Sequence, residues 1–397
     1  MSNKSELIFA PSVCREGFEN CGKNSCQRLY AATSLFKIRR FRWGGGLVRR
    51  KIMKIQLTHK FEDIISAENL LEAWKEFIKG KRSKSDVQEF SLNLMDNILS
   101  LHQELSNHIY IHGGYQAFNI SDPKPRNIHK ASVRDRLLHH AIYRILYPFF
   151  DRTFIDDSYS CREGKGTHKA ISRFRNFSRK VSKNNTKTCW ILKCDIKKFF
   201  ASIDHKILKE ILKVYIPDKN ILWLLDRVID SFSSNNFGVG LPLGNLTSQL
   251  LVNIYMNEFD QFIKHKLKAK YYIRYADDFV IFSDNKESLQ NQILLIKEFL
   301  KNKLKLELHP NKVFIKTLAS GVDFLGWVNF TEHRVLRTTT KRRMLKRIKE
   351  NPKSETINSY LGLLKHGNTY RLRRVIVEKL RSSKKIGFSP QVGGENF

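Results

Sequence analysis

Apolar residues recur at helical spacing in the N-terminal part of the chain. Between Phe61 and Leu105 an apolar side chain returns every three or four positions. The clearest examples are Ile64, Leu71, Trp74, Ile78, Phe90, Leu94 and Ile98. This spacing places the apolar side chains on one face of a helix, where they can pack against a core. We therefore predict a group of helices over residues 61–105.

The pattern changes to short apolar runs in the middle of the chain. Trp190–Asp195 is an apolar run that ends in an acid, and the segments 271–275 and 279–282 flank two adjacent acids, Asp277 and Asp278. Aromatic and β-branched residues such as those in the flanks favour strands, whereas Asp suits a tight turn. We predict a strand into Asp195 and a hairpin that carries both other acids at its tip.

Helical spacing alternates with these strands and continues toward the C-terminus. We predict helices over 207–214, over 221–232, from about 247, over 289–304 and over 341–347, a further apolar helical face over 357–364, and a single strand over 322–330. Helices and strands that alternate over one sheet are typical of an α+β fold.

Charge adds a partner class to this picture. The 397 residues include 71 Lys and Arg against 38 Asp and Glu, which gives a net charge of +33. Such a chain binds phosphates through release of counter-ions, although a membrane-surface or ribosome-associated protein can be equally basic. No stretch reaches the roughly 20 apolar residues of a membrane span, and the N-terminus lacks the order of a secretory signal. We expect a cytoplasmic protein of two or three domains with no membrane partner.

The first 52 residues form a basic segment without a sustained period. We expect either a flexible RNA-binding arm or a segment that does not belong to the native protein, with Met53 as an alternative start. Cys14, Cys21 and Cys26 lie in this segment, but their spacing does not match a zinc site and no His lies among them. We expect the cysteines to be reduced.

Three acids form the candidate chemistry of the chain. An Asp pair in a turn is usually a solvated loop, but Asp195 adds a carboxylate from a separate strand to Asp277 and Asp278. Magnesium prefers oxygen ligands, and a pair of metal ions needs ligands that converge from two sides. The spacing therefore points to metal-dependent nucleotidyl transfer.

The order of four motifs resembles that of reverse transcriptases, over about residues 61–374. An acid-ended strand is followed by Gly240-Leu-Pro-Leu-Gly244 with Ser248-Gln249, then by Tyr275-Ala-Asp-Asp278, then by Phe324-Leu-Gly-Trp327. The resemblance implies a right-hand polymerase with a palm of antiparallel sheet plus helices. It places fingers at 53–186, the palm at 187–332, a helical thumb at 333–384 and a disordered tail at 385–397.

The same resemblance assigns roles around the acids. Asp195, Asp277 and Asp278 become the catalytic, metal-binding triad for two Mg²⁺ ions, with Mn²⁺ as a possible substitute and the Ile196 carbonyl as an additional ligand. Phe200 resembles the steric gate that excludes the ribose 2′-hydroxyl, and ordinary core packing is its alternative.

Pro123-Lys-Pro-Arg-Asn-Ile-His-Lys130 resembles the fingers motif that holds the incoming triphosphate. Lys124 and Arg126 are the candidates for binding the dNTP phosphates, together with Gly244, since cations stabilise the charge of the leaving pyrophosphate. An exposed loop is the alternative for the two cations. Arg134 and Arg136, which follow, can equally be salt-bridging residues on a helix.

Two positions indicate which kind of reverse transcriptase the chain resembles. Leu243 stands before Gly244, and Ser248-Gln249 follows, where many reverse transcriptases have Gln-Gly and Ser-Pro. This pattern resembles the enzymes of diversity-generating retroelements, which copy a template-repeat RNA and misincorporate opposite its adenines. Leu243 and Gln249 would then lower fidelity through looser alignment of the nascent pair. The alternative is a packing substitution without effect on fidelity.

Phe324, Leu325, Gly326 and Trp327 resemble the primer grip, in which Gly lets the backbone approach the primer end. A buried strand with a bulge is the alternative. The cations after Val335 are candidates for tracking an RNA/DNA hybrid, since A-form duplexes are recognised by shape and phosphate contacts.

The resemblance thus implies an RNA-directed DNA polymerase of a diversity-generating retroelement. Its expected partners are template RNA, the RNA/DNA hybrid, dNTPs and a small basic accessory protein. A retron-like or group II intron-derived reverse transcriptase is the alternative. A non-catalytic RNA-binding scaffold is the alternative from another functional class.

Overall fold

A computed structural model describes residues 55–121, 125–234 and 236–385, with side chains described as far as Glu378. The helices are α1 (Phe61–Ile65), α2 (Ala67–Phe77), α3 (Ser85–Leu92), α4 (Leu94–Ser106), α5 (Val133–Asp151), α6 (Thr167–Val181), α7 (His205–Tyr215), α8 (Lys219–Asp230), α9 (Leu246–Gln261), α10 (Lys286–Leu304), α11 (Thr338–Glu350), α12 (Ser354–Leu364) and α13 (Tyr370–Lys385). The strands are β1 (Tyr115–Ile120), β2 (Arg126–Ala131), β3 (Trp190–Asp195), β4 (Tyr272–Tyr275), β5 (Asp278–Ser283), β6 (Phe314–Thr317), β7 (Val322–Phe324), β8 (Trp327–Asn329) and β9 (Arg334–Leu336). Short irregular helices are η2 (Phe199–Ser202), η3 (Phe262–Lys266) and η4 (Pro310–Lys312).

The chain divides into two compact units, each built from two segments. The first contains the described residues up to Phe154 and Lys198–Glu258, and the second contains Ile155–Lys197 and the described residues from Phe259 onward. The units therefore do not follow the chain order of the expected fingers, palm and thumb, and that division stays a prediction. The expected arm at 1–52 and its three cysteines lie outside the described residues.

Helices dominate the first unit. The helices predicted over 61–105 are confirmed as α1 to α4, and α2 packs against α5. Ser66 caps α2 by accepting a hydrogen bond from the Asn69 amide, which satisfies a donor that the first turn leaves free. The buried Leu70 and Phe77 then belong to the core. The β1–β2 hairpin pairs Tyr115 with Ala131 at one end and Ile120 with Arg126 at the other.

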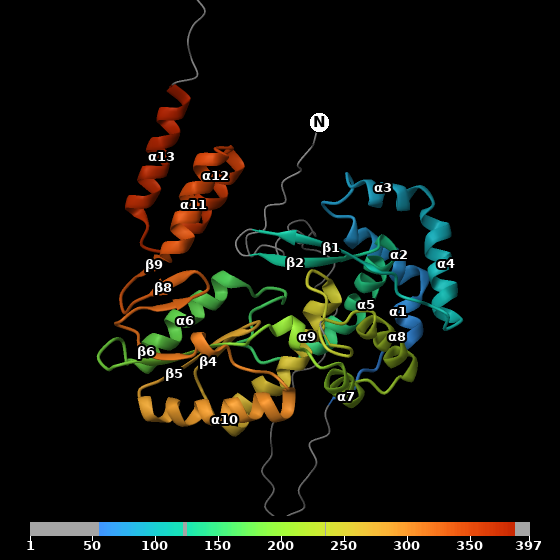
Figure 1. The fold of residues 1–397 in the computed structure, drawn as a ribbon, viewed down its shortest axis with the longest axis horizontal. Coiled ribbons are helices and arrows are strands. Elements are labelled where there is room, and N and C mark those ends of the chain that lie inside the picture. Colours follow the sequence, from blue (N-terminus) through green and yellow to red (C-terminus); the bar gives the residue numbers. More distant parts are fainter. Residues whose placement is uncertain (1–54, 122–124, 235, 386–397) are drawn as a thin grey trace, which may run out of the picture. The chain divides into compact units, whose positions relative to one another are not determined.

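An antiparallel sheet organises the second unit, with strand order β4-β5-β3-β6. Side chains alternate between its faces, as strand geometry requires. Ile191, Ile273 and Val280 point into a core with α6, and in Figure 1 α10 lies on the other side of the sheet from α6. The predicted strand into Asp195 and the predicted hairpin are confirmed. Mixed helices with antiparallel sheets agree with the expected α+β class.

The single strand predicted over 322–330 is wrong. The chain turns back between β7 and β8, where Leu325 has φ 51° and Gly326 has φ 86°. With β9 these strands form a separate antiparallel sheet. The reversal needs two successive residues in left-handed conformations, and Gly326 adopts its conformation without steric cost.

The predicted helices of the later chain are present as α7, α8, α9, α10, α11 and α12, with ends that differ by a few residues. Lys385 is the last residue of α13, and residues 386–397 of the expected tail lie outside the described chain. None of the helices in the described part is long and apolar enough to cross a membrane. No disulfide joins the cysteines that the structure describes, which are Cys161, Cys189 and Cys194.

Candidate active site

The predicted acids meet at one end of the sheet in the second unit. β3 and β5 are paired so that Asp195 lies opposite Asp278, the last residue of one strand against the first of the other. Asp277 stands next to them in the two-residue turn between β4 and β5. By the alternation of the strands, Asp195 and Asp278 share the face of Ile191 and Val280. Acids from two distant segments of the chain thus form one acidic cluster.

The backbone of the turn is held in an uncommon conformation. Ala276 has φ 54°, a left-handed conformation that costs a non-glycine residue about 1 kcal/mol. The Ile196 amide donates a hydrogen bond of 3.1 Å to the Asp277 carbonyl, which fastens the turn to the end of β3. Ile196 itself is buried. Its expected role as a carbonyl ligand stays a prediction.

Two lysines form ion pairs with two of the acids. Lys193 Nζ lies 3.3 Å from Asp278 Oδ2, and Lys312 Nζ lies 2.9 Å from Asp195 Oδ1. Burial raises the pKa of Asp278 to about 7; Lys193 opposes this rise, and the negative charges of Asp277 and Asp195 add to it. A cation next to such a carboxyl favours its ionised form and lowers its pKa.

The chemistry of the cluster fits a hard divalent cation. Asp278 Oδ1 is buried without a hydrogen-bond partner, and all three side chains offer oxygen, the ligand type that magnesium prefers. Across the described residues, no three His, Cys, Asp or Glu side chains are arranged as a ready metal cage. The lysine ammonium groups partly neutralise the acids instead.

Charged residues inside the strand patterns are a further signal of this site that is present in the sequence. Lys193 interrupts the apolar run of β3, and Arg274 interrupts the aromatic run of β4. A charged side chain within a buried strand is seldom stable without a partner. Both have carboxylate partners in the structure.

One of the candidate phosphate-binding residues, Arg126, lies on the β1–β2 hairpin of the first unit. Arg126 is exposed at the start of β2, while Lys124 lies outside the described residues. Arg134 and Arg136 follow on α5, where Arg134 bonds Glu104 and Arg136 lies 2.6 Å from Asp86. The salt-bridging alternative for these two arginines is therefore confirmed.

The loop that contains Leu243 is hydrogen-bonded to that hairpin. The His129 amide donates to the Leu243 carbonyl at 3.0 Å, and Asn245 Nδ2 donates to the His129 carbonyl at 3.0 Å. Gly244 is exposed with φ 109°, and a Cβ there would lie 2.9 Å from Ile128 Cγ2. Two hydrogen bonds thus join the loop to β2.

Phe200 and Gln249 belong to the same unit as this loop. The Leu241 amide donates to the Phe200 carbonyl at 2.8 Å, and the half-buried Phe200 ring meets Phe199 edge-on. Gln249 is half-buried in the first turn of α9. The structure thus joins the segment of Phe200 to the segment that continues into Leu243 and Gly244 by a backbone hydrogen bond, and the expected nucleotide-binding role of these residues stays a prediction.

The candidate primer-grip residues form the β7–β8 turn. Phe324 and Trp327 are buried, Phe324 in the core under α6 and Trp327 among the apolar side chains of α11, α12 and α13. Their side chains therefore pack in the core, as in the alternative of a buried strand. The strand is replaced by a hairpin, however, and not interrupted by a bulge. Leu325 and Gly326, which form the turn between Phe324 and Trp327, are half-buried, and their expected role at the primer end stays a prediction.

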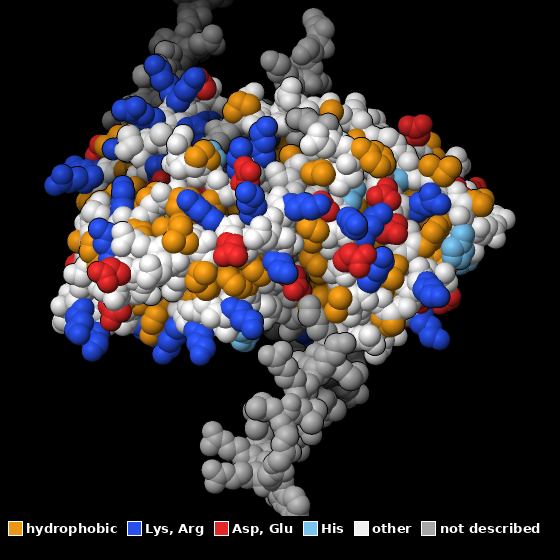
Figure 2. All heavy atoms as spheres, turned by 60° about the horizontal axis from the view of Figure 1, so that its bottom comes forward, with side chains coloured by type: hydrophobic (Ala, Val, Ile, Leu, Met, Phe, Trp, Pro, Cys, Tyr) orange, Lys and Arg blue, Asp and Glu red, His pale blue; other side chains and the backbone are white. Residues whose placement is uncertain are grey.

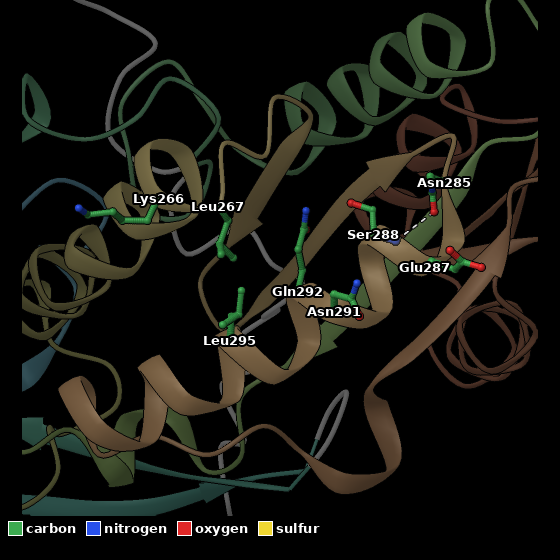
Figure 3. A pocket seen from close by; sticks show the side chains of 8 residues that line it. All are labelled: Lys266, Leu267, Asn285, Glu287, Ser288, Asn291, Gln292 and Leu295. Atoms are coloured by element: carbon green, nitrogen blue, oxygen red, sulfur yellow. Dashed lines mark hydrogen bonds between the residues drawn. The ribbon is translucent and has the colours of Figure 1, made fainter.

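A shallow depression of about 450 Å³ lies elsewhere in the second unit, beside η3 and the first half of α10. Figure 3 shows Lys266, Leu267, Gln292 and Leu295 around it. None of the three acids lines this depression. It therefore has no part in the candidate site.

Residues 121–328 match the family model of the reverse transcriptase (RNA-dependent DNA polymerase), which is more than half of the chain. The chain belongs to the reverse transcriptase family. The matched segment of this reverse transcriptase contains the three acids, Arg126, Phe200 and the Leu243 loop. The expected family is thereby confirmed.

Individual relatives of this reverse transcriptase are distant. It is 25% identical to Protein YkfC of Escherichia coli (strain K12) over 264 residues, which cover 56% of this chain and 66% of that protein. It is 26% identical to the Group II intron-encoded protein LtrA of Lactococcus lactis subsp. cremoris over 308 residues, 61% of this chain and 49% of that one. The matches thus span about half to two thirds of the length of these relatives.

Proposed function

We propose that this reverse transcriptase copies a template-repeat RNA of a diversity-generating retroelement into cDNA and misincorporates opposite adenine. The observation that supports polymerisation is the register that sets Asp195 opposite Asp278, with Asp277 beside them. Family membership supports RNA as template and dNTPs as substrates.

Each candidate residue has a task in this reaction. Asp195, Asp277 and Asp278 would hold Mg²⁺, which supplies activation of a primer 3′-hydroxyl and charge neutralisation on the leaving pyrophosphate. Arg126, with Lys124, binds the triphosphate through its fork of donors. Phe200 borders the ribose and excludes its 2′-hydroxyl.

The subtype rests on Leu243. Its carbonyl is engaged by His129, so the backbone position is fixed and only the side chain differs from the polar residue common in the family. An aliphatic side chain offers no hydrogen bond to align the nascent pair, and discrimination that lacks such a bond is weaker. A small basic accessory protein completes the proposal as a partner, by analogy with the retroelement enzymes.

The group II intron-encoded relative supports a second candidate function. In that case the chain is a group II intron-derived or retron-like reverse transcriptase, and Leu243 and Gln249 have no effect on fidelity. The two candidates differ in their error spectrum, which makes the decisive experiment simple.

The experiment is sequencing of cDNA made by the purified protein from a primed RNA of mixed sequence, with Mg²⁺ and four dNTPs. Errors concentrated at template adenines support the retroelement assignment, whereas accurate or evenly scattered copying supports the alternative. Asp277→Asn is the control, and synthesis is expected to fall by orders of magnitude because metal charge stabilisation contributes several kcal/mol. Unchanged synthesis by that variant would contradict the catalytic assignment. Absence of product from both proteins would leave either a scaffold or an enzyme that lacks its partner RNA and accessory protein.

Leu243→Gln tests the subtype at the residue that carries it. We expect fewer errors opposite adenine, because the amide restores a hydrogen bond near the nascent pair. The same cDNA sequencing measures the change, with total product as the control for activity. Equal error spectra for the two enzymes would assign Leu243 to packing alone.

A further inference from the structure

We propose that Arg274 is a positioning residue that holds the peptide group between Ala276 and Asp277. Its side chain lies on the face of the sheet opposite Asp195 and Asp278. This inference rests on the proposed function, because it takes Asp277 as a group of the polymerase reaction. Its basis is a buried ion pair whose guanidinium also donates a hydrogen bond to the turn.

The ion pair lies on the face of the sheet opposite the acids. Ile273 points into the core with α6, so its neighbours Tyr272 and Arg274 point the other way. Asp260, from the last turn of α9, meets them there. Arg274 and Asp260 are both fully buried, at 0% exposure of each side chain.

The guanidinium grips the carboxylate with two nitrogens. Arg274 Nε lies 2.8 Å from Asp260 Oδ1, and a terminal nitrogen, Nη2, lies 2.7 Å from Oδ2. The Tyr272 hydroxyl donates to Asp260 Oδ1 at 2.7 Å, which adds a third donor to the carboxylate. The rigid fork of an arginine matches a carboxylate in this way, and lysine cannot reproduce it.

The guanidinium also donates to one side-chain hydroxyl and to one backbone carbonyl. Nη2 also donates to Ser158 Oγ at 3.1 Å, and Nη1 donates to the Ala276 carbonyl at 3.2 Å. Because the ion pair fixes the plane of the guanidinium, the direction of Nη1 is fixed as well. The carbonyl of Ala276 therefore has one preferred orientation.

Asp277 consequently stands between two anchored peptide groups. The carbonyl before it accepts from Arg274, and its own carbonyl accepts from the Ile196 amide at 3.1 Å. With both peptide planes held, the Cα–Cβ bond of Asp277 points in one direction. The left-handed Ala276, with φ 54°, would otherwise relax.

A stabilising ion pair without influence on the acids is the competing explanation. Apolar residues can often replace a buried ion pair at little cost in stability, whereas removal of one partner leaves a buried charge and is strongly destabilising. The double replacement Asp260→Leu/Arg274→Met thus removes the donor to Ala276 without leaving a buried charge, and the remaining cost is the Tyr272 hydrogen bond to Asp260. Stability and positioning can be measured apart.

The experiment compares Arg274→Met, the double variant, Arg274→Lys and Ser158→Ala. Urea unfolding gives stability, electron paramagnetic resonance titration gives Mn²⁺ affinity, and single-nucleotide extension gives kcat and the dNTP KM. Asp277→Asn defines the Mn²⁺ binding that does not depend on the Asp277 carboxylate.

We expect Arg274→Met to lose stability and the double variant to regain most of it. The double variant and Arg274→Lys should still bind Mn²⁺ about tenfold to a hundredfold more weakly, as loss of a group that orients a ligand does. Their kcat should fall while the dNTP KM stays unchanged. Ser158→Ala, which keeps the bond to Ala276, should match the wild type in Mn²⁺ affinity.

Wild-type Mn²⁺ affinity and kcat in a folded double variant, or in Arg274→Lys if the double variant does not fold, would overturn the proposal. The two hypotheses fail separately. A wild-type protein that binds Mn²⁺ through Asp277 without synthesising DNA contradicts the proposed function, and the Mn²⁺ affinities of the variants still decide the role of Arg274.

Discussion

At the scale of single residues, the two candidate sites depend on backbone conformations that few residues adopt. Ala276 at the acidic turn and Gly244 beside Leu243 both have positive φ. Ala276 is held by hydrogen bonds to the two peptides that follow it, whereas Gly244 adopts φ 109° without a Cβ to clash. Such conformations persist only where the surroundings determine them, and they cluster at functional sites.

Gly244→Ala tests the loop at this scale. The added Cβ would lie 2.9 Å from Ile128 Cγ2 and would be strained at φ 109°. We expect a loss of about 1–3 kcal/mol in the free energy of unfolding and a raised dNTP KM, because the loop must move away from β2. Urea unfolding and nucleotide titration measure both effects.

Gly114→Ala is the matched control, since nothing lies within 4 Å of its added Cβ. Its stability should stay within about 0.5 kcal/mol of the wild type. Equal stability of the two variants would show that the Leu243 loop tolerates a side chain, and that its contact with β2 is not rigid.

At the scale of elements, the C-terminal helices pack on the β7–β8 hairpin in the second unit. Trp327 shares a core with Met344 of α11, Leu364 of α12 and Ile376 of α13. Arg337 forms an ion pair with Asp323, and the Asn368 amide donates to the Arg334 carbonyl at 2.8 Å. The hairpin proposed to face the primer is therefore held by the helices proposed to hold the duplex.

Gly367→Ala tests this packing. The connection between α12 and α13 passes so close to the indole that an added Cβ would lie 2.0 Å from Trp327 Cζ3. The Gly367 backbone and the Trp327 indole ring are both rigid and cannot easily move apart. We therefore expect a loss of about 3 kcal/mol in the free energy of unfolding. A thermal or urea melt of the purified variant measures the change.

Gly362→Ala provides the control from the same segment. It is exposed on α12 with open space around its Cβ, and a Gly to Ala change within a helix stabilises by about 0.5–1 kcal/mol. Opposite signs for the two variants are expected. A stable Gly367→Ala protein would mean that the connection does not press against Trp327.

At the scale of the whole molecule, positive charge predominates. Figure 2 shows Lys and Arg side chains spread over the displayed face, with fewer Asp and Glu among them. The net charge of +33 favours binding to any nucleic acid and supplies no sequence specificity. Exposed cations on α11, such as Lys341 and Arg342, are the candidates for contacts with the duplex backbone.

Neutralisation of these two side chains tests the assignment. We expect Lys341→Gln/Arg342→Gln to weaken binding of an RNA/DNA hybrid and to reduce the slope of log K against log salt by about one per lost phosphate contact. Affinity measurements over a range of salt concentrations give the slope. Lys301→Gln/Lys303→Gln on the exposed surface of α10 removes the same charge and should leave the slope nearly unchanged; equal reductions would argue for charge alone.

The sequence by itself determined the local elements and the family. Periodicity places apolar side chains on one face of each helix or strand, so β3, the β4–β5 hairpin and α7 to α12 were predictable from neighbours in the chain. The adjacent acids and the ordered motifs indicated the family for the same reason, because each motif is a short run of residues.

The tertiary structure decided which distant residues meet. The pairing of Asp195 with Asp278, the lysine on each of them and the ion pair of Arg274 with Asp260 all join residues from separate elements. Strand register and long-range packing select such partners, and periodicity along the chain does not predict them. The turn at Leu325 and Gly326 escaped prediction likewise, because packing of Phe324 and Trp327 into two different cores bends a run that reads as one strand.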